Sequence, residues 1–136
     1  MSQNAGKTIL ADYFDCSMSD LKNPERIQSE VLSVCPAAAP FQLIQLDSGG
    51  IHGAFQIRDI FLTIHTDPER RFAAVEISII RNEKEFDYFK IIRRLKKTFG
   101  ARNFFTMEVR RGIEFTQETP APEAGKVPEL SSRKDG

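Results

Sequence analysis

Apolar and polar residues alternate along much of this chain, as they do in β-strands that bury one face. Residues 8–15 place Ile9, Ala11 and Tyr13 on one face and Leu10, Asp12 and Phe14 on the other, as a strand does. Similar segments predict further strands over residues 41–46, 54–57, 61–66, 71–80 and 103–109. Arg58-Asp59 lies between two of these segments and predicts the turn of a hairpin.

Two segments change to the three-to-four-residue spacing of a helix. Asn23 suits the N-cap position and Pro24 the first helical position, so a helix is predicted from there to the region of Cys35. The second predicted helix covers residues 85–99 and ends before Gly100, a residue typical just after a helix. Its apolar row consists of Tyr88, Phe89, Ile92, Leu95 and Phe99.

Together these elements predict an α+β fold, a two-layer sandwich with helices on one face of a mainly antiparallel sheet. Alternation indicates which face the helices cover. One row of the strand over residues 71–80 is apolar throughout and consists of Ala73, Val75, Ile77 and Ile79. The opposite row carries Glu76 and Ser78, and His65 lies on the same side of the neighbouring strand. We therefore expect a pocket or a partner on the face that carries these three polar side chains.

The length and composition predict one domain over residues 1–116 and a disordered tail over residues 117–136, where prolines and scattered charges replace any periodic pattern. Lys and Arg together number 19, as do Asp and Glu, and this balance argues against a protein built around a polyanion. No apolar segment is long enough to span a bilayer, and the first residues lack a signal peptide. Cys16 and Cys35 are therefore interpreted as reduced thiols in a cytoplasmic protein.

Two further patterns favour ordinary surface roles. The second predicted helix carries five cations that avoid its apolar row, which favours a solvated face over a nucleic-acid-binding one: Lys90, Arg93, Arg94, Lys96 and Lys97. His52, His65, Glu76 and Cys16 do not have the spacing of a known metal site, so no metal is expected.

The most informative motif is Ile64-His65-Thr66 followed after one residue by Pro68-Glu69, with Ala73-Ala74 and Glu76 further along. The segments 11–16 and 107–112 flank it near the two ends of the domain. Over residues 7–115 this arrangement resembles the small, prokaryotic type of S-adenosylmethionine decarboxylase. The resemblance implies that family's fold, a homodimer associated through its sheets, and a link to polyamine synthesis.

The resemblance also implies which positions would carry the reaction. In the family, a serine in this strand is cleaved from the preceding residue and becomes a pyruvoyl cofactor. The matching residue here is Ile60, flanked by Asp59 and Phe61 where the family has glutamate and histidine. A serine that assists processing falls at His52, and the cysteine that donates a proton falls at Ile80.

Among the matched residues, His65 retains the histidine that assists processing in the family. An aromatic residue that stacks on adenine is matched by Leu46, and Glu69 keeps its place in the motif. Together with His65, these residues and Glu76 are the candidate ligand-binding side chains.

The leading hypothesis is a decarboxylase homologue that has lost its activity, carries no cofactor and acts by binding. Its expected partners are a second copy, an active decarboxylase paralogue, or an adenosyl or polyamine ligand, with no nucleic acid and no membrane. An alternative hypothesis is an active decarboxylase that forms its cofactor from another serine, Ser48 or Ser78. A third is a sensor that retains an adenosyl pocket.

Overall fold

The structure is a computed structural model that describes residues 6–80 and 86–112. Six strands form one antiparallel sheet in the order β2-β3-β4-β5-β1-β6. The strands are β1 (Gly6–Phe14), β2 (Ala39–Gln45), β3 (Ile51–Ile57), β4 (Ile60–Asp67), β5 (Phe72–Ile79) and β6 (Asn103–Arg111). A short 3₁₀ helix (η1, Asp20–Lys22) precedes α1 (Pro24–Val34), and α2 (Tyr88–Thr98) connects β5 to β6.

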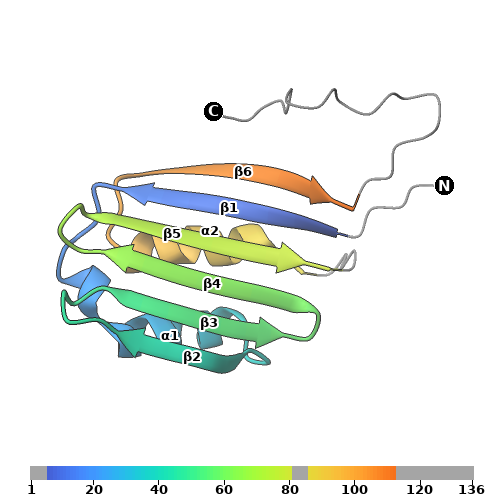
Figure 1. Cartoon of the computed structure of the whole chain (residues 1–136), viewed down its shortest axis with the longest axis horizontal. Helices are drawn as coiled ribbons and strands as arrows, with labels where there is room; N and C mark the ends of the chain where they lie inside the picture. Colours follow the sequence, from blue (N-terminus) through green and yellow to red (C-terminus); the bar gives the residue numbers. More distant parts are fainter. Residues whose placement is uncertain (1–5, 81–85, 113–136) are drawn as a thin grey trace, which may run out of the picture.

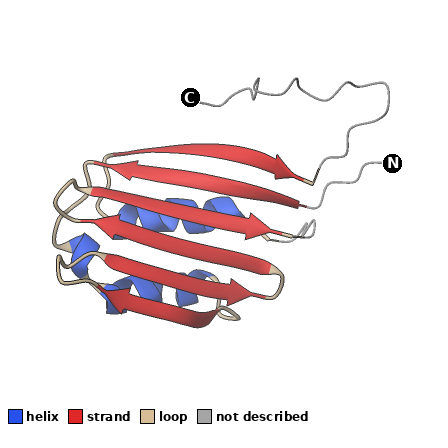
Figure 2. Ribbon diagram, in the orientation of Figure 1, coloured by secondary structure: helices blue, strands red, loops and turns tan. Residues whose placement is uncertain are grey.

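Both α-helices lie on the same side of the sheet and leave its other face uncovered (Figures 1 and 2). The predicted α+β sandwich is therefore confirmed. The predicted strands are confirmed as well, although β2 begins two residues earlier than expected and β3 three residues earlier. The predicted tail over residues 117–136 lies outside the described residues. Within the described part of the chain, no helix is long and apolar enough to cross a membrane.

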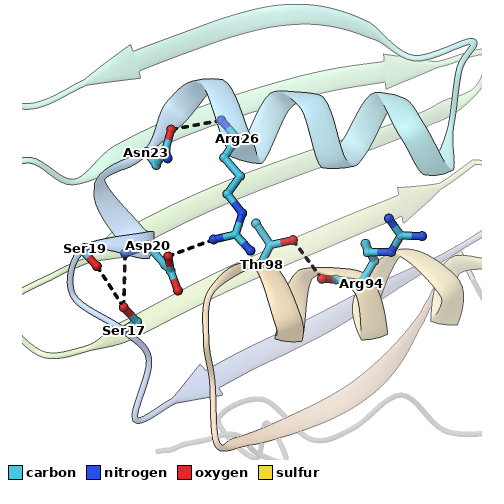
Figure 3. A network of polar contacts seen from close by, with 7 residues as sticks. All are labelled: Ser17, Ser19, Asp20, Asn23, Arg26, Arg94 and Thr98. Carbon is cyan, nitrogen blue, oxygen red and sulfur yellow. Dashed lines mark hydrogen bonds and ion pairs between the residues drawn. The ribbon is translucent and has the colours of Figure 1, made fainter.

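The first helix begins where the sequence predicts. The Asn23 side chain accepts a hydrogen bond from the backbone N–H of Arg26 at 3.1 Å, which satisfies one of the free donors of the first turn. Arg26 in turn contacts Asp20 of η1 at 2.9 Å, so the same turn also anchors the segment before the helix (Figure 3). On α2, the Thr98 hydroxyl donates to the carbonyl oxygen of Arg94 at 2.9 Å.

The second helix differs from the prediction at its start and in its buried row. It begins at Tyr88, with Asp87 as its N-cap. The predicted core residue Phe89 is 40% exposed, whereas Ile91 is buried. Sequence spacing alone allowed either residue beside Ile92, and packing in the folded protein buries Ile91. The helix ends before Gly100, whose φ of 63° is the left-handed conformation expected after a helix.

Alternation along the strands divides the side chains into an inner and an outer row. The inner row and the two helices form the core, in which Leu62, Ile64 and Phe55 are fully buried. Tyr13 also points inward, and its hydroxyl donates to the carbonyl oxygen of Ile92 at 2.9 Å. This bond satisfies the one polar group of a buried ring and joins β1 to α2.

The outer row contains an unusual amount of exposed apolar surface. Phe105 is 57% exposed and Met107 49%, and both lie on the outer face of the edge strand β6. Further exposed apolar side chains on this face or at its margins are Phe14, Ile44, Phe61, Ile80 and Val109. Clustered exposed apolar side chains of this kind are a common feature of interaction surfaces.

Thr66 links three elements of the fold through one buried hydroxyl. Its oxygen accepts from the backbone N–H of Ile51 at 2.9 Å and donates to the carbonyl oxygen of Leu21 at 2.9 Å. The bond therefore joins β4 to the start of β3 and to η1.

We predict that Thr66→Val lowers the free energy of unfolding by about 1–3 kcal/mol, because it leaves a buried N–H and a buried carbonyl without partners. Urea denaturation followed by circular dichroism measures this change. Thr63→Val is the matched control, since Thr63 lies on the outer row of the same strand and makes no side-chain hydrogen bond within the described residues. Equal effects of the two substitutions would contradict the assignment.

Candidate functional site

Two histidines from neighbouring strands meet on the outer face of the sheet. His52 of β3 pairs directly with His65 of β4 across the antiparallel ladder. Their ring centroids are 4.4 Å apart and the ring planes meet at 72°, an edge-to-face contact. The sequence nominated both residues separately, and the strand register brings them together.

This pair lines a cavity of about 700 Å³ at the end of β4. The predicted residue Leu46 lies on its wall, as does Ser48 from the β2–β3 turn. Phe14 and Phe72 also line the cavity, and their ring centroids are 5.6 Å apart. This volume is within the range of cavities that bind cofactors and other small molecules.

Charged side chains also line this cavity, which we call the histidine cavity. They comprise two carboxylates and two guanidinium groups: Asp15, Asp67, Arg70 and Arg71. Asp67 is engaged by Arg70, with 3.8 Å between Oδ2 and Nε. The cavity thus combines an aromatic wall, two imidazoles and charges of both signs, which suits an organic ligand with several polar groups.

The pKa of His65 reflects these surroundings. Burial lowers this pKa below its ordinary value of 6.5, the neighbouring His52 lowers it further, and Glu76 opposes both with a smaller upward effect. The neutral imidazole is therefore favoured in the folded protein. Neutral imidazole can accept a hydrogen bond on one nitrogen and donate one from the other.

A smaller hollow of about 160 Å³ adjoins the histidine cavity on the same face. His65 lies between the two, and the hollow is lined by Glu76, Asp12, Phe105 and Met107 among others. Burial raises the pKa of Asp12. The structure therefore brings the predicted residues His65 and Glu76 to one site, together with a second carboxylate.

The other predicted site residues lie at the opposite end of β4. Ile60 starts this strand and is 1% exposed, because it belongs to the inner row and pairs with Ile79 of β5. Phe61 is on the outer face, and Ile80 is 60% exposed just beyond β5. The backbone N–H of Ile80 donates to the carbonyl oxygen of Asp59 at 3.4 Å, which joins the end of β5 to the β3–β4 turn.

Within one chain, the predicted residues therefore form two separate groups. Ile60 and His65 are five residues apart on one strand, a separation of about 16 Å along its axis. The first group contains Asp59, Ile60, Phe61 and Ile80, and the second contains Leu46, His52, His65 and Glu76. A ligand in the histidine cavity of one chain would not contact Ile60 of that same chain.

The structure also bears on the other residues considered from the sequence, namely Glu69, the possible metal ligands and Cys16. Glu69 is exposed in the β4–β5 turn and is not on the wall of either cavity. The described residues contain no group of three or more side chains that could hold a metal ion. Burial, followed by the Asp15 carboxylate, raises the pKa of Cys16 to about 11, so this thiol stays protonated at neutral pH.

Sequence reasoning missed Phe14, Phe72, Asp15 and Arg71 as parts of the site. The alternation of β1 placed Phe14 on the outer row, which was a usable signal. The closeness of β1 to the β4–β5 turn depends on the strand order, with β1 inserted between β5 and β6. No local pattern reveals that insertion.

We predict that His65 titrates below 6.5 and that His52→Gln raises its pKa, because the substitution removes the neighbouring imidazolium. Glu76→Gln should lower the pKa of His65 instead. The contribution of His65 to stability is present in full above pH 6.5 and is lost as the pH falls through the lower pKa of the folded state. Titration of the imidazole Cε1–H signals by NMR tests this, and an unchanged midpoint in His52→Gln would refute the coupling.

Comparison with known proteins agrees with this architecture. A solved adenosylmethionine decarboxylase from Aquifex aeolicus superposes with a TM-score of 0.67 at 16% identity, over 88% of this chain and 99% of that one. The S-adenosylmethionine decarboxylase proenzyme of Acidithiobacillus ferrooxidans is 30% identical over 94% of this chain and 98% of its own length. That of Clostridium kluyveri is 29% identical over 79% of this chain and 87% of its own length. A profile of S-adenosylmethionine decarboxylase matches residues 7–112, and the chain belongs to this family.

Proposed function

We propose that this protein is a member of the S-adenosylmethionine decarboxylase family that forms no pyruvoyl cofactor and acts by binding. One observation carries the proposal. The position that corresponds to the cofactor-forming serine holds Ile60, a hydrocarbon side chain packed in the core. An alkyl group cannot attack the preceding carbonyl, so the chain cannot cleave itself there.

The surroundings of Ile60 support a structural role for this residue. It pairs with Ile57 across the β3–β4 turn and with Ile79 on β5, and all three side chains are buried. A pyruvoyl group reacts as a ketone that captures a substrate amine, and it needs access to the substrate. The residues present at this position therefore do not fit the cofactor.

The position matched to the family's proton donor also lacks a group that can donate a proton. Ile80 has no proton to transfer, and it contributes apolar surface instead. Loss of both groups removes the formation of the cofactor and the protonation that follows decarboxylation.

The histidine cavity supports a retained binding function. It keeps His65, and Leu46 offers an apolar surface where the family has an aromatic ring. The cavity is large enough for a small organic molecule. An adenosyl compound related to the family's substrate is the ligand that these features favour, with a polyamine as the second candidate.

A second copy of the chain is the partner that the outer face favours. In a twofold dimer that pairs outer faces, the Ile60 end of one sheet can lie over the histidine cavity of the other. The two separate groups of predicted residues would then meet across the interface. The exposed side chains of Phe105 and Met107 would be buried by the same contact. An active decarboxylase chain of the same fold could take the place of the second copy.

One observation favours an active enzyme as the alternative. Ser48 lies on the wall of the histidine cavity, in the turn before β3, and its hydroxyl oxygen accepts from the backbone N–H of Gly50 at 3.2 Å. This hydroxyl is the candidate nucleophile with access to a ligand. The other candidate, Ser78, lies on the outer row of β5 opposite Phe61.

We predict that the purified protein has the intact mass of the uncleaved chain and releases no carbon dioxide from S-adenosylmethionine. Mass spectrometry and a carbon dioxide assay test the two parts. Ile60→Ser is the informative variant, since it restores a hydroxyl at the cleavage position. Two fragments from the wild-type chain, one with a pyruvoyl end, would refute the proposal, and loss of cleavage in Ser48→Ala would identify the alternative nucleophile.

We predict that the wild-type chain forms a dimer of twice its 15.4 kDa mass and that Met107→Lys produces monomers. The substitution places a charge on each side of a twofold apolar interface. Size-exclusion chromatography with light scattering measures the mass. Arg93→Glu, on the exposed face of α2, is the control and should leave the dimer intact. A wild-type monomer at high protein concentration would rule out the homodimer.

A further inference from the structure

Arg71 has a backbone conformation that is costly for its residue type. Its φ is 53°, in the left-handed region, where the Cβ atom crowds the backbone and glycine is favoured. Two backbone hydrogen bonds hold it there. Its N–H donates to the carbonyl oxygen of Pro68 at 3.1 Å, and its own carbonyl oxygen accepts from Cys16 at 3.0 Å.

This conformation coincides with the histidine cavity. Three non-glycine residues have positive φ among the described residues, and two of them, Asp15 and Arg71, line this cavity. Aspartate tolerates the left-handed region better than most residues, whereas arginine has no such preference. A strained residue at a binding site suggests that its side chain has a function that glycine could not provide.

The guanidinium group of Arg71 makes no hydrogen bond or ion pair with any other described residue. Several other arginines of the chain do have partners: Arg26 contacts Asp20 at 2.9 Å, and Arg94 contacts Glu30 at 2.8 Å. The adjacent Arg70 is held by Asp67. The backbone of Arg71 is thus held in place, and its guanidinium donors are available to a ligand in the cavity that this residue lines.

The other groups of the cavity restrict which anion fits. Asp15 lines the same cavity, and its carboxylate disfavours a ligand that carries several negative charges. A single carboxylate is planar and matches the paired donors of a guanidinium group. The rings of Phe14 and Phe72 supply an adjacent apolar wall for the uncharged part of the ligand.

We propose that Arg71 is a specificity-determining residue that binds the carboxylate of the ligand in the histidine cavity. This inference rests on the proposed binding function and refines it. The protein would then distinguish a carboxylate-bearing compound from its decarboxylated product, which differ by the one group that Arg71 recognises. Such selectivity would suit a protein that binds the substrate of a decarboxylation without performing it.

Isothermal titration calorimetry of the full chain tests the inference with three adenosyl compounds: S-adenosylmethionine, decarboxylated S-adenosylmethionine and 5′-methylthioadenosine. We expect the first to bind about tenfold or more tightly than the other two, the difference associated with a charge-assisted hydrogen bond. In Arg71→Gly this preference should disappear. The melting temperature should stay the same or rise, because glycine relieves the left-handed strain. An unchanged or higher melting temperature would show that weaker binding by Arg71→Gly does not result from unfolding.

Arg58→Gly is the matched control, since Arg58 also has a left-handed φ, of 55°, but lies in the β3–β4 turn away from the cavity. It should leave the preference unchanged. Equal binding of all three compounds, or a preference that survives in Arg71→Gly, would overturn this inference while the adenosyl pocket stands. L-Methionine separates the two proposals further, because it carries the carboxylate but no adenosyl group. If L-methionine binds in an Arg71-dependent way and the adenosyl compounds do not bind, the carboxylate contact stands and the adenosyl pocket is refuted. If neither L-methionine nor any of the adenosyl compounds binds, both proposals fail.

Discussion

Burial of a single face of the sheet is the constraint on which the rest of this structure depends. Two helices cover the inner row of side chains, and the strand period of two residues then assigns every neighbour to the opposite surface. Ile60 and Phe61 illustrate the consequence, since the first is 1% exposed and the second 38%. Whether a side chain is buried or exposed therefore depends on whether its position in the strand is odd or even. A side chain in the inner row stabilises the core, and one in the outer row is available for binding.

The outer face in turn explains why the candidate site is divided. β4 presents His65 near one end and begins with Ile60 at the other, and a rigid strand cannot bring its own two ends together. A chain of this design therefore needs a second sheet if both ends are to act on one ligand. The exposed apolar side chains between the two ends are what such a second sheet would bury. Division of the site and exposure of the face are thus two results of the same architecture.

Sequence patterns could predict the features that depend on local chemistry. Alternation identified the inner rows, the side chain of Asn23 marked the start of α1, and Gly100 marked the end of α2. Features that depend on long-range placement could not be predicted in this way. Phe89 and Ile91 both lie close in sequence to Ile92 on α2, and only the packing of the helix in the folded protein decides which of them is buried. The cavity joins residues from β1 and from the β4–β5 turn, which become neighbours through the strand order.

The sequence motif explains the position of the histidine cavity but not its charge. Within the motif, His65 points outward because of parity, and Pro68 begins the turn that places Arg71 on the cavity wall. The conformation of Arg71 is imposed by that turn and by the bond from Cys16, so neither composition nor spacing reveals it. A chain that retained only the fold of its family would gain stability from glycine at this position. Arginine at position 71, together with an alkyl side chain at position 60 where the family's reaction requires a hydroxyl, supports the proposal of a protein that binds its ligand without decarboxylating it.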